Sequence, residues 1–124
     1  MYLNEFEFVR RSFIETNEFT KKWNELGFDD DYLGLLQEMI MRNPSIGKVI
    51  KGTGGIRKMR FQLPNKTGKR TGARVCYIDY EETKTTILLT VYVKKNKSDL
   101  TNKEVKNLRI LEQYLKQKYG EKNE

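Results

Sequence analysis

The sequence predicts one α+β domain, in which a small antiparallel sheet of three to four strands packs against an N-terminal helical hairpin and a C-terminal helix. Helical periodicity fills much of the first third of the 124-residue chain, β-rich segments follow over residues 56–93, and a last helical pattern closes it. This length fits a single domain over residues 1–124. We expect residues 1–10 to form an N-terminal arm and residues 120–124 a frayed tail.

The N-terminal elements are predicted to be a short strand and two helices. Ser12 to Glu15 has the composition of a strand, and Thr16 or Asn17 can cap the helix that follows. One face of this helix carries Phe19, Trp23 and Leu26, and Gly27 ends it. Acidic residues 29–31 suit the start of a second helix, which ends before Pro44. Its apolar positions are Leu33, Leu36, Met39 and Ile40.

The sheet and the last helix follow a glycine-rich loop, residues 47–55. We predict strands at about residues 56–63, 73–80 and 85–93, with a polar connector at 64–72 and a hairpin at Glu81-Glu82. Thr101 and Glu104 have the spacing of a capping box, which predicts where the last helix begins. The apolar face of that helix carries Val105, Leu108, Leu111 and Leu115.

Positive charge is concentrated in the middle of the chain. The net charge is +7, yet residues 1–46 hold 5 basic and 9 acidic residues, while residues 47–98 hold 13 basic and 3 acidic. The middle segment therefore carries +10, and residues 99–124 carry +1. Clustered Lys and Arg predict a surface that meets phosphates, whereas scattered lysines alone would indicate only a solvated surface.

Several classes of site are disfavoured by composition. The chain has no histidine and one cysteine, Cys76, so we expect no disulfide, no zinc site, no other metal and no cofactor. The apolar neighbours of Cys76 predict a buried structural thiol. No apolar run is long enough for a membrane span and no secretory signal is visible, so we expect a cytoplasmic protein without a membrane partner.

Strand alternation predicts where the charge gathers. Lys58 and Arg60 share one face of their strand, Arg74 begins the next, and Tyr92 and Lys94 share a face at the end of the third. Antiparallel pairing should bring Arg74 beside Tyr92 and Lys94, and pairing with the first strand would add Lys58 and Arg60.

This patch can either hold phosphates or cleave RNA. Cleavage requires a base for the 2′-hydroxyl, positive charge for the phosphorane and an acid for the leaving oxygen. Without histidine, a lysine with a depressed pKa can act as the base, tyrosine or a second cation can assist, and arginine can clamp. Each of these residues also has a purely structural alternative: Tyr92 can pack in the core, and Lys94 and Lys95 can form a solvated strand end. Residues 52–55 could cradle a phosphate, but neither GxxxxGK(S/T) nor GxGxxG is present, so a plain loop is expected there.

Long ordered motifs resemble the HigB branch of the RelE/ParE toxin superfamily. Residues 47–60 read GKVIKGTGGIRKMR, residues 68–74 read GKRTGAR, and residues 88–101 read LLTVYVKKNKSDLT. The resemblance extends from about Phe13 to the final helix. It implies a small α+β fold, ribosome-dependent cleavage of messenger RNA, and an antitoxin partner with a helix-turn-helix domain (HigA-like). Operator DNA would be bound only through that antitoxin.

The resemblance also implies site residues. In RelE-like enzymes, basic pairs on one strand match Lys58 and Arg60, an arginine matches Arg74, and a basic residue after the last strand matches Lys94 or Lys95. With Tyr92, we take Lys58, Arg60, Arg74 and Lys94 as the candidate catalytic set. The remaining candidates, as contacts to RNA or the ribosome, are Lys51, Arg57, Lys66, Lys69, Arg70, Lys95 and Lys97. The absence of histidine separates this chain from HigB proteins that cleave with histidines.

Two other functions fit the same sequence. One is a non-catalytic nucleic-acid-binding domain, and the other is a ParE-like toxin that acts on DNA gyrase, since one fold serves several functions. The basic residues Lys58, Arg60, Arg74 and Lys94 favour the ribonuclease, because gyrase poisoning needs no such cluster.

Overall fold

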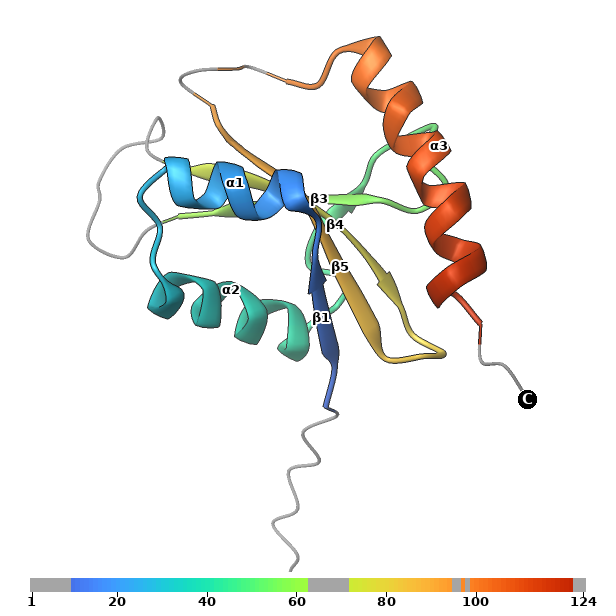
Figure 1. Ribbon diagram of the computed structural model, residues 1–124, viewed down its shortest axis with the longest axis horizontal. Coiled ribbons are helices and arrows are strands. Elements are labelled where there is room, and N and C mark those ends of the chain that lie inside the picture. The colour runs from blue at the N-terminus through green and yellow to red at the C-terminus, as the bar shows by residue number, and fades with distance from the viewer. Residues whose placement is uncertain (1–9, 63–71, 95–96, 98, 122–124) are drawn as a thin grey trace, which may run out of the picture.

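The computed structural model describes residues 10–62, 72–94, 97 and 99–121, and within them it holds three helices and a five-stranded sheet (Figure 1). The strand order is β1-β5-β4-β3-β2. The elements are β1 (Ser12–Glu15), α1 (Asn17–Glu25), α2 (Asp30–Arg42), β2 (Lys48–Val49), β3 (Arg57–Phe61), β4 (Ala73–Tyr80), β5 (Thr85–Val93) and α3 (Asn102–Tyr119).

The sheet differs from the prediction in size and in direction. It has five strands instead of three to four, and it is mixed, because β1 pairs parallel to β5 while the other pairs are antiparallel. The additional strand β2 lies inside the expected loop of residues 47–55, where Lys48 and Val49 pair with Lys58 and Arg57. Two residues carry too little β pattern to be recognised in a glycine-rich segment.

The predicted helical hairpin is confirmed. The Thr16 side chain accepts a hydrogen bond from the backbone N–H of Phe19, and Asp29 accepts one from Tyr32, so both helices begin at side-chain caps. Gly27 follows α1 with φ of 75°, a conformation that favours glycine over other residues.

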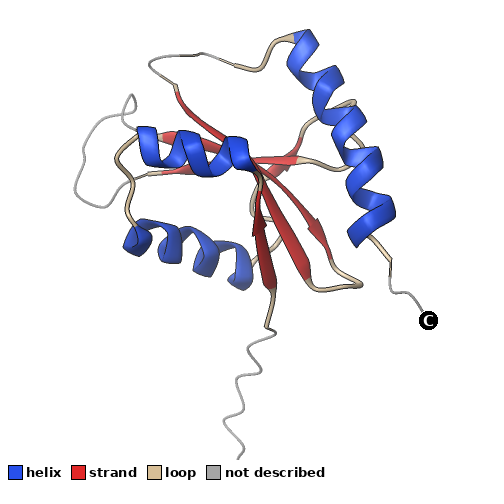
Figure 2. Ribbon diagram, in the orientation of Figure 1, coloured by secondary structure: helices blue, strands red, loops and turns tan. Residues whose placement is uncertain are grey.

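Helices cover both faces of the sheet, as Figure 2 shows, and two apolar cores result. On one face α1 and α2 pack their buried residues against the sheet; this core includes Phe19, Trp23, Leu36, Ile40, Met59, Phe61, Val75 and Tyr77. On the other face lies α3; this core includes Ile56, Cys76, Ile78, Ile87, Leu89, Tyr92, Leu108 and Leu115. None of the helices in the described part is apolar enough over its length to cross a membrane.

The glycine-rich loop is a docking point for α3. Buried Thr53 accepts a hydrogen bond from the backbone N–H of Ile56 and donates one to the carbonyl of Ile50, which closes the loop. Gly54 has φ of 83°, and a Cβ there would lie 2.9 Å from the carboxyl carbon of Glu112 on α3. The predicted capping box of Thr101 and Glu104 is confirmed at the start of that helix. Most of the predicted arm (residues 1–9), most of the connector (63–71) and the end of the tail (122–124) lie outside the described residues.

Candidate functional site

Three of the candidate site residues form one row across the sheet. Arg74 on β4 lies opposite Arg60 on β3 and opposite Tyr92 on β5. Lys58 lies one row away, opposite Cys76, on the same face of β3 as Arg60. Lys94 directly follows the end of β5 and is exposed. We call Arg60, Arg74 and Tyr92 the cationic row; it lies on the face of the sheet that α3 covers, and Lys58 and Lys94 flank it.

Arg74 is buried, unlike the exposed cations Arg60 and Lys94 beside it. It is only 9% exposed, because β4 is the central strand and has neighbours on both sides. Its Nη1 lies 3.5 Å from the carbonyl oxygen of Ala73, at the limit of a hydrogen bond, and no carboxylate of the described residues pairs with it. A buried guanidinium with so little compensation is costly, and an anionic ligand would offset that cost.

Tyr92 is also buried, at 8% exposure, and its hydroxyl has no hydrogen-bond partner in the described structure. Burial, chiefly, raises the pKa of Tyr92 to about 12. The phenol is therefore protonated near neutral pH and can donate a hydrogen bond or a proton but cannot act as a base. The ammonium of Lys97 lies 5.8 Å from the ring centroid, in cation–π range.

Two ion pairs connect this region to the segment before α3. Lys58 Nζ lies 2.9 Å from Asp99 Oδ1, and this hydrogen bond, with a second from the backbone N–H of Leu100, lowers the pKa of the Asp99 carboxyl below its usual value. Lys97 pairs with Glu104. The Asp99 carboxylate takes one of the three N–H donors of Lys58, and its negative charge opposes a phosphate that approaches the same ammonium.

The other predicted contacts are dispersed. Arg57 lies on the opposite face of β3 from Lys58, and its Nη1 donates a 2.7 Å hydrogen bond to the carbonyl of Gly47. There it anchors the segment before β2, which the hydroxyl of Tyr77 also contacts through Gly47 and Pro44. Lys51 is exposed in the turn before β3. The remaining four, Lys66, Lys69, Arg70 and Lys95, lie outside the described residues.

Cys76 is a buried structural thiol, as predicted. It has no exposed surface, and burial, chiefly, raises its pKa to about 12, so it is not a nucleophile near neutral pH. Within the described ranges, no three residues of the types His, Cys, Asp and Glu gather in a way that could hold a metal ion.

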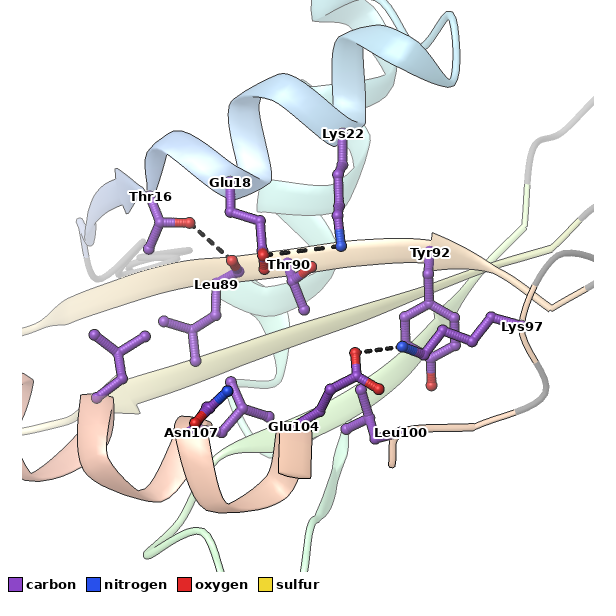
Figure 3. A pocket seen from close by; sticks show the side chains of 12 residues that line it. Thr16, Glu18, Lys22, Leu89, Thr90, Tyr92, Lys97, Leu100, Glu104 and Asn107 are labelled. Atoms are coloured by element: carbon purple, nitrogen blue, oxygen red, sulfur yellow. Dashed lines mark hydrogen bonds and ion pairs between the residues drawn. The ribbon is translucent and has the colours of Figure 1, made fainter. Parts of the chain in front are cut away.

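A cleft that sequence reasoning missed adjoins the cationic row. It has a volume of about 320 Å³ and lies over β5, between α1 and α3. In Figure 3, Glu18 and Lys22 on α1 lie on one side of β5, and Glu104 and Asn107 on α3 lie on the other. Tyr92 belongs to both the row and the cleft. The sequence offers one signal for this cleft: Thr90 and Tyr92 are polar side chains two residues apart on one strand, and so share a face.

Comparison with known proteins identifies the fold. No family model matches this chain. Among solved structures, the chain is similar to a double arginine-to-alanine mutant of the Escherichia coli toxin RelE in the free state, with a TM-score of 0.52 and 13% sequence identity. The match covers 82% of this chain and 96% of that one. The chain therefore has a RelE-like α+β fold.

Proposed function

We propose that this protein is the toxin of a type II toxin–antitoxin pair, of the HigB-like kind, and that it cleaves messenger RNA in the ribosomal A site as a metal-independent endoribonuclease. The RelE-like fold and the motifs quoted above support the family assignment. The observation that carries the proposal is the row Arg60–Arg74–Tyr92, in which a buried arginine without a carboxylate partner lies between a second arginine and a protonated phenol.

This row suits the charge that develops during RNA cleavage. The 2′-oxygen of the substrate attacks the adjacent phosphorus, the bond to the 5′-oxygen breaks, and a 2′,3′-cyclic phosphate remains. Arg60 and Arg74 stabilise the negative phosphorane, because positively charged hydrogen-bond donors near growing charge lower the barrier most. A basic side chain beside the row accepts the proton of the 2′-hydroxyl, and Lys94 and Lys58 are the candidates for this role.

The hydroxyl of Tyr92 can supply the proton that the leaving 5′-oxygen needs. This hydroxyl has no hydrogen-bond partner within the described structure, so the transfer of its proton breaks no internal hydrogen bond. With the phenol protonated at neutral pH, it is in the correct state for an acid or a hydrogen-bond donor. The exposed cations Lys51 and Lys94 then serve to attract the RNA and the ribosome.

The partners follow from this activity. The substrate complex is the ribosome with its messenger RNA, and the site of action is the cytoplasm. A HigA-like antitoxin with a helix-turn-helix domain neutralises the toxin, and operator DNA is bound through that antitoxin. Co-expression of the adjacent helix-turn-helix gene should restore growth and give a complex on purification.

Programmed ribosomes provide the direct test. The purified protein is incubated with ribosomes carrying a defined messenger RNA, and the new RNA ends are mapped with and without a chelator. Cuts in the A-site codon that persist in the chelator are the expected result. Binding without cuts would instead identify a non-catalytic nucleic-acid-binding domain, and inhibition of gyrase supercoiling without cuts would identify a ParE-like toxin.

A further inference from the structure

The cleft between α1 and α3 contains polar groups without partners. Thr90 is 6% exposed and Tyr92 is 8% exposed, and neither hydroxyl makes a hydrogen bond to any described residue. Both side chains come from one face of β5, and the amide of Asn107 joins them from the rim on α3 (Figure 3). Buried polar groups normally have partners, so two unpaired hydroxyls in one cleft, with an exposed amide at its rim, point to a ligand.

The rest of the cleft is apolar and close to neutral. Leucine side chains line it, namely Leu89, Leu100, Leu108 and Leu111. Its charged residues occur as pairs of opposite sign: Glu18 with Lys22 at 3.9 Å, and Lys97 with Glu104. An apolar lining with a few convergent polar groups is typical of a small-molecule or aromatic-ring site, and the balanced charge does not favour a phosphate.

The position of the cleft relates it to the cationic row. Neighbouring strands lie about 4.8 Å apart, so Tyr92 on β5 is one strand spacing from Arg74 on β4. A phosphate held at Arg60 and Arg74 would therefore lie next to Tyr92, which lines the cleft. A nucleotide has this arrangement of parts, with a charged phosphate at one end and a neutral aromatic base at the other.

We propose that this cleft binds a nucleobase adjacent to the scissile phosphate, that the ring of Tyr92 forms the wall beside this base, and that Thr90 and Asn107 read its edge. This inference rests on the proposed ribonuclease function and adds to it the residues that set sequence preference. Threonine hydroxyls and asparagine amides both donate and accept, so they can match the donor and acceptor pattern of one base. A base that mismatches leaves the buried Thr90 unpaired, and discrimination arises from that penalty.

The test measures preference instead of overall rate. Ribosomes are programmed with messenger RNAs randomised over the A-site codon and its neighbours, and the cut positions are sequenced. The variants are Thr90→Val, which keeps the shape of the side chain, and Asn107→Leu, which alters an exposed rim position. The matched control is Gln113→Leu, an exposed amide on α3 that does not line the cleft. Thermal unfolding of each variant checks its fold.

The expected result is a loss of about tenfold in the ratio of cuts between the best and the worst base at one position, equal to about 1.4 kcal/mol, in Thr90→Val and Asn107→Leu but not in Gln113→Leu. Folded variants that keep the wild-type preference would overturn the base-binding proposal and leave the ribonuclease function intact. Wild-type protein that makes no cuts on any RNA would overturn both.

Discussion

Arg60 and Arg74 lie directly opposite each other across β3 and β4, so two guanidinium groups occupy one cross-strand pair. Like charges in this position destabilise a sheet. On its other side, Arg74 pairs with Tyr92 of β5. The hydroxyl of Tyr92 has no hydrogen bond in the described structure. Like-charge repulsion and an unsatisfied hydroxyl in one row lower the free energy of unfolding of the free protein. An anion bound between the two arginines would offset this loss.

Replacement of Arg74 by methionine should therefore separate activity from stability. We expect Arg74→Met to lower messenger RNA cleavage on ribosomes by at least about a hundredfold, because a donor to the phosphorane is lost. The free energy of unfolding should rise by about 0.5–1 kcal/mol, because the repulsion with Arg60 is removed. Denaturant unfolding and end mapping measure the two quantities. A less stable variant would show that Arg74 supports the fold.

Loss of either exposed cation should lower activity without lowering stability. Lys94→Ala is expected to change the free energy of unfolding by no more than about 0.5 kcal/mol, since its side chain is exposed. Arg60→Ala removes the same repulsion as Arg74→Met and should raise the free energy of unfolding by up to about 0.5–1 kcal/mol. Each should lower cleavage by about a hundredfold to a thousandfold. Lys106→Ala, an exposed lysine on α3, is the control and should cut normally. Wild-type cutting by both variants would mean that the site lies elsewhere.

Removal of the Tyr92 hydroxyl tests its role as a proton donor. With the pKa of Tyr92 raised to about 12, the cleavage rate should show no step from this residue as the pH rises through the neutral range. Tyr92→Phe should lower cleavage by about a hundredfold. It should not lower the melting temperature, because the hydroxyl that is removed is buried without a partner. Unchanged cleavage would assign the proton to another group.

At the far end of the sheet, Arg11 and Asp79 form a buried ion pair. Arg11 Nη1 lies 2.7 Å from Asp79 Oδ1, and the two side chains are 4% and 9% exposed. Arg11→Met should lower the free energy of unfolding by about 3–5 kcal/mol, because it leaves the carboxylate buried without its cation. Arg42→Met is the control, since Arg42 and Glu38 form an exposed pair of the same length, and it should cost at most about 0.5 kcal/mol.

The effect of Arg11→Met should depend on pH in a defined direction. Burial raises the pKa of Asp79 in the wild type, although the hydrogen bond from Thr86 and the charge of Arg11 oppose the rise. Removing Arg11 takes away one opposing influence, so the pKa rises further. The penalty is present where Asp79 is ionised and shrinks as the pH falls through its raised pKa. The difference in the free energy of unfolding between Arg11→Met and wild type should therefore become smaller in acid. Urea unfolding at several pH values measures this difference, and a difference that stays constant with pH would show that the buried Asp79 carboxylate is not its cause.

Two glycines of one loop provide a matched pair. Gly52 and Gly54 both have positive φ, of 86° and 83°, but a Cβ on Gly52 would meet only Val105 at 3.8 Å. On Gly54 it would collide with Arg109 and Glu112 of α3. Gly54→Ala should therefore be less stable than Gly52→Ala by about 1 kcal/mol or more. Equal melting temperatures would show that α3 moves to accommodate the methyl group.

Much of the fold could be predicted from local pattern. The bounds of β1, β4 and β5 agree with the prediction, and so do the caps at Thr16 and Thr101. These features depend on residues a few positions apart, through side-chain alternation and hydrogen bonds to nearby backbone. The pairing of Arg74 with Tyr92 was also predictable, because a short hairpin joins their strands and fixes the direction of pairing.

Only the tertiary structure decided the rest, since it depends on segments far apart in the chain. The parallel pairing of β1 with β5 joins residues about 70 positions apart, and no local pattern encodes it. An arginine is usually found at the surface, so the sequence does not predict that Arg74 is buried. Its burial depends on the strands at both sides of β4. The cleft requires α1 and α3 to meet over β5. Sequence alone determined which chemical groups the chain carries and their local order; packing decided which of them are buried, paired or left without a partner.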